Sequence, residues 1–375
     1  MSTGAAPPAQ PARAPAPAVP PARHRTEADR PAPRPPQPGE ETHEVLADRP
    51  GVLVVRHGDT VVKTHTAGTD REALTRRLRT AAHPALRGVL LPPLPFDDRG
   101  TLLLTGADGR ATTRWPHGTP VDPHRPEAAP WQQAARLLAG LHTVPPQELP
   151  CTPPPFRGPR KVALAVRRMR TAVTAAAGAQ AEETAGPAPA VPAQPAHPAA
   201  PGPPPGQAPV LPQAAAPVVE RAAALLPSWA TGAAPAPRAD TLCHGDLHLG
   251  QLVHRPDGGG WLLIDVDDMG LGDPAWDLAR PAAWFAAGLL APETWAAFLT
   301  AYQAAGGTAV HTADDPWPQL DVPARALTVQ TAALAVAKAA TGRRVLDAVE
   351  QVVVDACARM ATPPRPSAPR TGSVG

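Results

Sequence analysis

Residues 243–268 read Cys-His-Gly-Asp-Leu-His-Leu-Gly-Gln-Leu-Val-His-Arg-Pro-Asp-Gly-Gly-Gly-Trp-Leu-Leu-Ile-Asp-Val-Asp-Asp. Two strand-like runs, Gln251–Arg255 and Trp261–Val266, flank Pro256–Gly260, whose proline, aspartate and glycines predict a turn. The stretch is therefore typical of a β-hairpin. If its five-residue loop closes symmetrically, the cross-strand pairs are Arg255 with Trp261, Val253 with Leu263, and Gln251 with Asp265.

In this register Gln251 and Asp265 meet at the open end of the hairpin, with their Cβ atoms about 4.5–5.5 Å apart. A carboxamide oxygen and a carboxylate suit a hard cation such as Mg²⁺, which leaves its other positions to water and substrate phosphates. Asp246 lies on the loop before the first strand, where a base could accept a hydroxyl proton beside a metal-bound phosphate. The pattern predicts a phosphoryl-transfer site. It depends on register, because a slip of one residue would turn Gln251 and Asp265 to opposite faces.

Further motifs lie on both sides of the hairpin. His244-Gly-Asp246 is followed five residues later by a carboxamide, then by Ile264-Asp265 and by Gly272-Asp-Pro-Ala-Trp-Asp-Leu-Ala279. With these motifs the chain resembles the aminoglycoside phosphotransferase family over roughly Glu44 to Met360, excluding a Pro/Ala-rich internal stretch. Most members have Asn where this chain has Gln251, and the maltokinase-like sugar kinases of the same superfamily look similar, with Gly-Gln in this place.

The resemblance implies a fold and a reaction. The family shares its fold with protein kinases, so we expect an α+β, bilobal chain with a small antiparallel-sheet N-lobe and a larger, mainly helical C-lobe. The implied reaction transfers the γ-phosphoryl group of ATP to a hydroxyl of a small molecule, such as an aminoglycoside, a sugar or another metabolite. ATP and Mg²⁺ are the implied cofactors, with Asp246 as catalytic base and Gln251 and Asp265 as magnesium ligands. His248 stands where protein kinases have a Lys that touches the transferring phosphate, so we expect a transition-state contact from it.

The lysine that holds the ATP phosphates is expected on a strand of the N-lobe, and Val61-Val-Lys-Thr64 offers one. Lys63 is conspicuous because only three of the 35 Lys and Arg residues are Lys. Glu72, on the next helix, is its expected ion-pair partner if the kinase resemblance holds. Alternatively, Thr69-Asp-Arg-Glu72 forms a capping box. Asp48-Arg-Pro-Gly51 is the candidate turn where protein kinases have a glycine-rich loop.

Three segments are too rich in Pro and Ala to form a core. The chain has 55 Pro, and many of them fall in residues 1–40, in residues 361–375 and in an internal stretch over about 186–217. Such tracts cannot bury enough apolar surface to offset the entropy of ordering. We expect a disordered leader, a disordered tail and a flexible insert, respectively.

Two lobes are expected between these tracts. Over 41–115 we predict a nucleotide-binding lobe, because β-branched runs at 52–56 and 60–64 are separated by His-Gly-Asp and are followed by a helical segment over 71–79. Over 116–360 apolar residues recur mostly at helical spacing, which predicts a helical lobe that carries the catalytic loop and the acceptor site.

The bulk composition excludes several classes of protein. The net charge is +2, and one Tyr and four Phe leave few rings for base stacking, so no nucleic-acid partner is expected. Cys151, Cys243 and Cys357 are odd in number and widely spaced, which argues against a disulfide framework and fits a cytoplasmic location. No apolar run approaches the roughly 18 residues of a membrane span. We expect no membrane partner and no obligatory protein partner.

Several residues near the motif have structural explanations. His244 is expected to orient the catalytic loop through a hydrogen bond and not to act as a base. Asp273-Pro274 is typical of a helix start, with the Asp as cap. Asp277 lies in the first helical turn, where the helix dipole favours it, and the family resemblance adds that such an Asp braces the catalytic loop. Asp267 and Asp268 are expected on a solvated loop.

The basic residues from Arg157 to Arg170, Lys161 included, are expected on a solvated helix face.

Two other functions stay open. Gln251 and the missing glycine-rich loop suggest a catalytically inactive, kinase-like protein that binds a nucleotide or metabolite. A zinc-dependent hydrolase could use the acidic and imidazole groups of His244–His248.

Overall fold

The computed structural model describes residues 43–49, 51–185, 210–255, 257–310 and 315–362. The expected leader over 1–40 lies outside the described residues, as do most of the expected insert and most of the expected tail. Residues 212–217 of the expected insert belong to helix α4 (Pro212–Ala224). Helical structure thus resumes before the Pro/Ala-rich composition ends.

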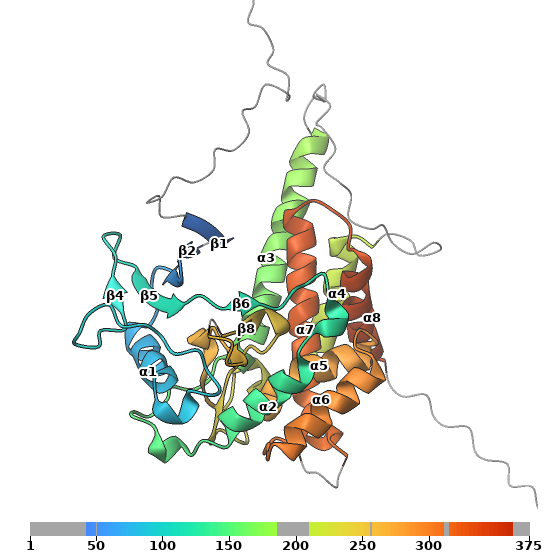
Figure 1. The fold of residues 1–375 in the computed structure, drawn as a ribbon. Coiled ribbons are helices and arrows are strands. Elements are labelled where there is room, and N and C mark those ends of the chain that lie inside the picture. The colour runs from blue at the N-terminus through green and yellow to red at the C-terminus, as the bar shows by residue number, and fades with distance from the viewer. Residues whose placement is uncertain (1–42, 50, 186–209, 256, 311–314, 363–375) are drawn as a thin grey trace, which may run out of the picture. The chain divides into compact units, whose positions relative to one another are not determined.

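The N-terminal part of the chain forms a five-stranded antiparallel sheet in the order β1-β2-β3-β5-β4 (Figure 1). Its strands are β1 (His43–Arg49), β2 (Val52–His57), β3 (Thr60–Thr64), β4 (Leu104–Thr105) and β5 (Ala111–Pro116). The turn between β2 and β3 contains Gly58, whose φ of 58° suits a residue without a Cβ atom. The expected hairpin over 52–64 is confirmed.

Helix α1 (Arg71–Ala81) connects β3 to the second half of this sheet. Its N-cap is Asp70, whose carboxylate accepts a hydrogen bond from the Ala73 amide at 3.0 Å. The alternative capping box at Thr69–Glu72 is therefore wrong, because the helix begins one residue later than that box requires. One face of α1 is buried at helical spacing by Leu74, Leu78 and Ala81.

The chain passes from the N-terminal sheet to a second sheet directly after β5. Residues 117–118 lead into β6 (Thr119–Pro120), which pairs with β8 (Leu252–His254) of the hairpin. Gly118 packs so closely that a Cβ atom there would lie 2.7 Å from the Val253 side chain. The strand order β6-β8-β9, with β9 at Trp261–Leu263, places the hairpin beside the connector between the two parts of the chain.

The rest of the chain is mainly helical. Its helices are α2 (Trp131–His142), α3 (Gly158–Ala185), α4, α5 (Ala275–Ala287), α6 (Pro292–Ala304), α7 (Trp317–Thr341) and α8 (Ala348–Met360). Helices α3 and α7 run side by side (Figure 1), and α4, α5 and α8 also pack on α7. Because α7 is enclosed by its neighbours, apolar side chains are buried around most of its circumference.

Two short strands, β7 (Thr241–Cys243) and β10 (Gly270–Gly272), pair antiparallel within the helical part. The catalytic-loop motif begins directly after β7, and the segment 264–269 leads directly into β10. An antiparallel N-terminal sheet followed by a mainly helical region confirms the expected α+β fold class. Among the described residues, no helix has both the length and the apolar character to cross a membrane.

Candidate active site

The hairpin has a different register from the expected one. Leu252 pairs with Leu263, Val253 with Leu262, and His254 with Trp261. The amide of Arg255 donates to the carbonyl of Gly260 at 2.8 Å, so Gly260 belongs to the closing pair and the loop is shorter than predicted. The predicted pairing of Gln251 with Asp265 across the strands is therefore wrong by one residue.

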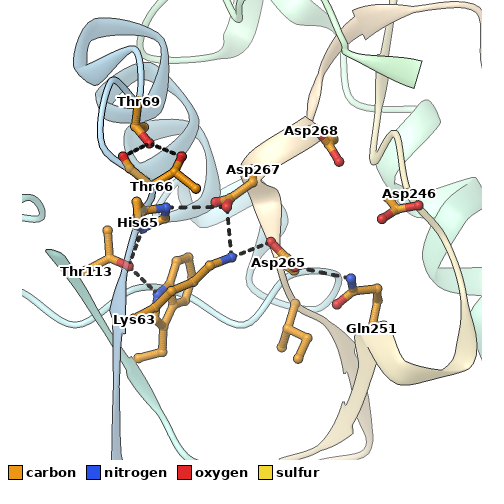
Figure 2. A network of polar contacts seen from close by, with 12 residues as sticks. Lys63, His65, Thr66, Thr69, Thr113, Asp246, Gln251, Asp265, Asp267 and Asp268 are labelled. Atoms are coloured by element: carbon orange, nitrogen blue, oxygen red, sulfur yellow. Dashed lines mark hydrogen bonds and ion pairs between the residues drawn. The ribbon is translucent and has the colours of Figure 1, made fainter. Parts of the chain in front are cut away.

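Gln251 and Asp265 nevertheless meet (Figure 2). The Gln251 Nε2 atom donates to Asp265 Oδ2 at 3.2 Å. The strand β9 ends at Leu263, and Asp265 has φ of 63° and ψ of 72°, a left-handed conformation that Asp adopts more readily than most residues. Because Asp265 lies beyond the strand, the alternation of faces no longer sets its direction, and the slip in register does not separate the two side chains.

The loop over residues 244–250, which the sequence predicts to be the catalytic loop, is held by a buried carboxylate. Asp277, which is 1% exposed, accepts hydrogen bonds from the amides of His244 at 2.6 Å and Gly245 at 2.7 Å. His142 Nε2 lies 3.0 Å from the same carboxylate. Burial opposes the charge of Asp277, but the hydrogen bond from His142 and the other contacts outweigh it and lower its pKa. The expectation that this Asp braces the loop agrees with these contacts.

The loop also packs tightly on the segment after the hairpin. Gly245 has φ of 85°, and a Cβ atom at this position would lie 2.6 Å from the carbonyl oxygen of Asp268. His244 is fully buried, and its Nε2 lies 2.8 Å from the carbonyl oxygen of Ile264. These contacts fix the position of Asp246, and they give His244 the orienting role that the sequence suggested.

Asp246 lies between two cations. Lys161 Nζ is 2.8 Å from Asp246 Oδ2, and Arg280 Nη2 donates to Asp246 Oδ1 at 2.8 Å. Arg280 also donates through Nε to the carbonyl of Leu247, which fixes its guanidinium beside the loop. Burial raises the pKa of Asp246, but Lys161 and Arg280 outweigh burial and lower it to about 2. Asp246 is therefore ionised at neutral pH.

Lys63 connects the N-terminal sheet to the hairpin segment. Its Nζ lies 2.7 Å from Asp265 Oδ1 and 2.9 Å from Asp267 Oδ2 (Figure 2). Burial opposes the charge of Lys63, but the two carboxylates raise its pKa above the ordinary value. The predicted pair with Glu72 is wrong: the Glu72 side chain is 76% exposed and pairs with Arg76.

Asp267 and Asp268 are not on a solvated loop, contrary to expectation. Asp267 contacts Lys63 and His65, and its pKa is lowered because these partners outweigh the effect of its burial. Asp268 Oδ2 lies 2.7 Å from Lys161 Nζ, so this lysine contacts two carboxylates at once. Each of the two aspartates is thus part of a charged network around the loop.

Lys161 and Arg280 are the site residues that sequence reasoning missed. Lys161 was assigned to a solvated face of α3, whereas its ammonium lies among carboxylates from the catalytic loop and from the hairpin segment. The scarcity of lysine, which drew attention to Lys63, applied equally to Lys161. Arg280 carries no comparable signal, because it is one of many arginines on amphipathic helices.

His248 contributes an uncharged imidazole to the loop. Its Nδ1 accepts a hydrogen bond from the Gly250 amide at 3.1 Å and caps a short turn over Leu249–Gln251. Burial lowers the pKa of His248 to about 4, in spite of the nearby Asp246. The cations beside Asp246 are therefore Lys161 and Arg280. His244 and His248 bond separate backbone groups, which argues against a shared zinc ion.

The donor set at Gln251 and Asp265 fits a hard divalent cation. It consists of a carboxylate and a carboxamide, both oxygen ligands of the kind that Mg²⁺ prefers. Gln251 is 7% exposed and uses Nε2 toward Asp265, which leaves its Oε1 for a further partner. The residues present are therefore chemically suited to hold the ion implied by the resemblance.

One comparison with known proteins identifies a family. The sequence profile of the phosphotransferase enzyme family (APH) matches residues 42–321, more than half of the chain. A search of curated protein sequences found no match. Many solved structures are similar, and three of them are described next.

The first is a choline/ethanolamine kinase family protein from Mesorhizobium loti, with 17% identity, 85% of this chain and 86% of that chain covered, and a TM-score of 0.45. The second is macrolide 2′-phosphotransferase MphH from Brachybacterium faecium, with 18% identity, coverage of 87% and 93%, and a TM-score of 0.41. The third is a thermostable mutant of aminoglycoside phosphotransferase APH(4)-Ia, in a ternary complex with AMP-PNP and hygromycin B, with 15% identity, coverage of 85% and 93%, and a TM-score of 0.48. From the profile match over residues 42–321, the chain belongs to the phosphotransferase enzyme family, as the sequence motifs led us to expect.

Proposed function

We propose that the protein transfers the γ-phosphoryl group of ATP to a hydroxyl of a small molecule. In this proposal Asp246 binds the acceptor hydroxyl through its carboxylate. The family makes the chain a phosphotransferase with an alcohol group as acceptor. The observation that carries the proposal is the convergence of Lys63, Asp265 and Gln251 beside the loop of Asp246. A cation for phosphates, oxygen ligands for a metal and an ionised carboxylate are the parts that phosphoryl transfer requires.

Lys63 is proposed to hold the ATP phosphates. Its ammonium is shared by Asp265 and Asp267. Gln251 and Asp265 would hold Mg²⁺, which when bound supplies positive charge to the phosphate oxygens. Ligand complexes of similar proteins support ATP as the donor: one contains AMP-PNP with hygromycin B and another contains ADP with spectinomycin.

Asp246 is proposed to orient the acceptor hydroxyl and to accept its proton as the new P–O bond forms. A carboxylate with a pKa of about 2 is a weak base, so its main contribution is to position the hydroxyl and to stabilise the proton as it departs. Lys161 and Arg280 contact its two oxygens and fix its orientation. The Gly250-Gln251 pair supports a maltokinase-like form of the catalytic loop as the finer assignment.

The test is the exchange of Asp246 for Asn, with Asp257→Asn as the control on an exposed loop. We expect Asp246→Asn to reduce acceptor-dependent ADP release by at least about 100-fold, while AMP-PNP still binds in the presence of Mg²⁺. Calorimetry measures the binding and a coupled assay measures the turnover. Unchanged turnover in Asp246→Asn would rule out this mechanism. Nucleotide binding without any turnover in the unmodified protein would instead favour the inactive, nucleotide-binding alternative.

A further inference from the structure

A cavity of about 470 Å³ lies between α1 and the beginning of α3. Its wall combines residues of α1 with the chain from Pro154 to Arg160 and with the end of the N-terminal sheet. Pockets of this size hold small-molecule ligands. The charged and imidazole groups in its lining are His65, Asp70, Arg77, Arg157, Arg160 and Asp267.

Arg77 is the buried cation of this cavity. Its residue is 6% exposed, and its Nε donates to the carbonyl of Met269 at 2.7 Å. Within the described part of the chain, its two terminal nitrogens have no protein acceptor. Burial and the neighbouring Arg157 lower the pKa of Arg77 and outweigh the opposing effects of Asp268, Asp267 and Asp70, so these carboxylates compensate its charge only in part. A buried guanidinium that presents free N–H groups to a cavity is suited to a carboxylate or a phosphate.

The two carboxylates of the lining favour the charge of Arg77 through space, but their ion pairs and hydrogen bonds go to other groups. Asp267 is engaged by Lys63 and His65. Asp70 caps α1 through the Ala73 amide. The three arginines therefore face a cavity in which both acidic groups already have other partners.

The cavity adjoins the reaction centre. Asp267 forms part of its wall and also contacts Lys63. Arg157 lines the cavity, and its Nε lies 3.5 Å from Asp268 Oδ1. Asp268 in turn contacts Lys161, which contacts Asp246. Lys63 itself is not among the residues of the wall, so an anion in the cavity would be a different group from the ATP phosphates assigned to Lys63.

We propose that this cavity binds a carboxylate or phosphate group of the acceptor, so that the acceptor is an anionic hydroxyl compound. The inference rests on the proposed phosphotransferase function and names its substrate class. The ammonium groups of a polycationic aminoglycoside would lie close to three arginines here. Repulsion between these like charges disfavours binding of such an acceptor. The site selects instead for hydroxy acids or for phosphorylated alcohols and sugars.

The binding experiment uses inorganic phosphate as the probe, titrated by calorimetry into the full-length protein saturated with Mg²⁺ and AMP-PNP. We expect one site whose Kd rises at least tenfold in Arg160→Ala and in Arg77→Met and is unchanged in Arg168→Ala, an exposed residue of the same helix. Arg160 is exposed, so its exchange tests the site without disturbing the core. Absence of phosphate binding, or an equal effect of Arg168→Ala, would overturn the site. A parallel titration omits AMP-PNP, and phosphate binding seen only in that titration would assign the anion to the nucleotide and overturn its assignment to the acceptor.

The turnover experiment compares acceptors that differ in charge, with ADP release as the readout. Suitable pairs are gluconate with glucose and glycerate with glycerol, and kanamycin serves as the polycation. We expect kcat/KM to be at least tenfold higher for the anionic member, and we expect Arg160→Ala to remove this advantage. Equal or better use of the neutral member or of kanamycin would overturn the proposal. Phosphate binding that responds to Arg160→Ala, without turnover of any acceptor, would support the anion site while the proposed function failed.

Discussion

Lys161 places its ammonium 2.8 Å from the Asp246 carboxylate and 2.7 Å from the Asp268 carboxylate. The lysine belongs to α3, whereas the two aspartates lie on either side of the β8–β9 hairpin. The first turn of a long helix thus supplies a cation to the catalytic loop. A group in this position can neutralise charge on a phosphoryl group as it approaches Asp246.

We predict that Lys161→Met reduces kcat by about 100-fold or more, because one preorganised cation is removed from the reaction centre. The exchange also moves the acid limb of the pH–rate profile. The pKa of Asp246 is held at about 2 against burial, so loss of Lys161 raises that pKa and shifts the limb to higher pH. Lys338→Met, at an exposed position of α7, is the matched control. An unshifted acid limb in Lys161→Met would contradict the assignment.

Gln251 is predicted to govern the requirement for Mg²⁺. Replacing it by Ala removes a carboxamide ligand and the hydrogen bond to Asp265, so we expect the Mg²⁺ concentration for half-maximal activity to rise about tenfold. The KM for ATP at saturating Mg²⁺ should change much less. Gln132→Ala, on the exposed face of α2, controls for nonspecific effects. A uniform loss of kcat at every Mg²⁺ concentration would speak for a purely structural role of Gln251.

Gly245 and Gly258 form a natural pair for testing the packing of the catalytic loop. Both have positive φ, 85° and 78° respectively, so an exchange for Ala costs about 1 kcal/mol of backbone energy at either position. At Gly258 the added Cβ meets open space, whereas at Gly245 it would lie 2.6 Å from the Asp268 carbonyl. We expect Gly245→Ala to lower the free energy of unfolding more than Gly258→Ala does, and to lower kcat as well. Equal losses in urea titrations would show that the loop can move away from Asp268.

Asp277 is predicted to be a main determinant of stability. Asp277→Ala leaves His142 and two buried amides without their acceptor, so we expect a loss of about 3–5 kcal/mol in the free energy of unfolding. The pKa of Asp277 is lowered in the folded state. Its contribution is therefore complete above the unfolded pKa of about 3.9 and is lost as the pH falls through the folded value.

Asp321→Ala, on the exposed part of α7, provides the comparison in the same chemical denaturation series. It should cause a much smaller loss, because a surface ion pair contributes little. The acid sensitivity of the unmodified protein should also diminish in Asp277→Ala, since the group responsible is gone. A variant that kept its full stability at pH 7 would show that the loop is held mainly by its apolar contacts.

Sequence patterns predicted the local elements well and the distant contacts poorly. The hairpin over 52–64, the helix over 71–79 and the helical C-terminal part were visible because periodicity and turn residues act over a few residues. The ion-pair partner of Lys63 could not be predicted in this way. Glu72 and Asp267 are both acidic, and only the folded chain determines which of them the Lys63 ammonium contacts. Lys161 was misassigned for the same reason: a polar helix face can meet solvent or another part of the chain.

The register of the β8–β9 hairpin illustrates how two residues can meet as expected although the strand pairing that predicted their meeting is wrong. A five-residue loop was expected from the composition, but Arg255 pairs with Gly260 and the whole pairing is offset by one residue. Gln251 and Asp265 are still in contact because Asp265, just after β9, has a left-handed backbone conformation that directs its carboxylate toward Gln251. The alternation of side chains along a strand does not predict this conformation. Turn geometry of this kind depends on φ and ψ at one residue, and the sequence indicates it only weakly.

The left-handed backbone of Asp265 restricts which residues evolution or engineering can place there. Gly, Asn and Asp tolerate that conformation, whereas longer side chains are disfavoured in it. Glu, normally regarded as the closest substitute for Asp, would therefore keep the charge but would disfavour the backbone conformation that orients the carboxylate. Asn would keep the backbone and lose the charge. Position 265 thus has two requirements, a negatively charged side chain and tolerance of a left-handed backbone, and Asp is the residue that meets both.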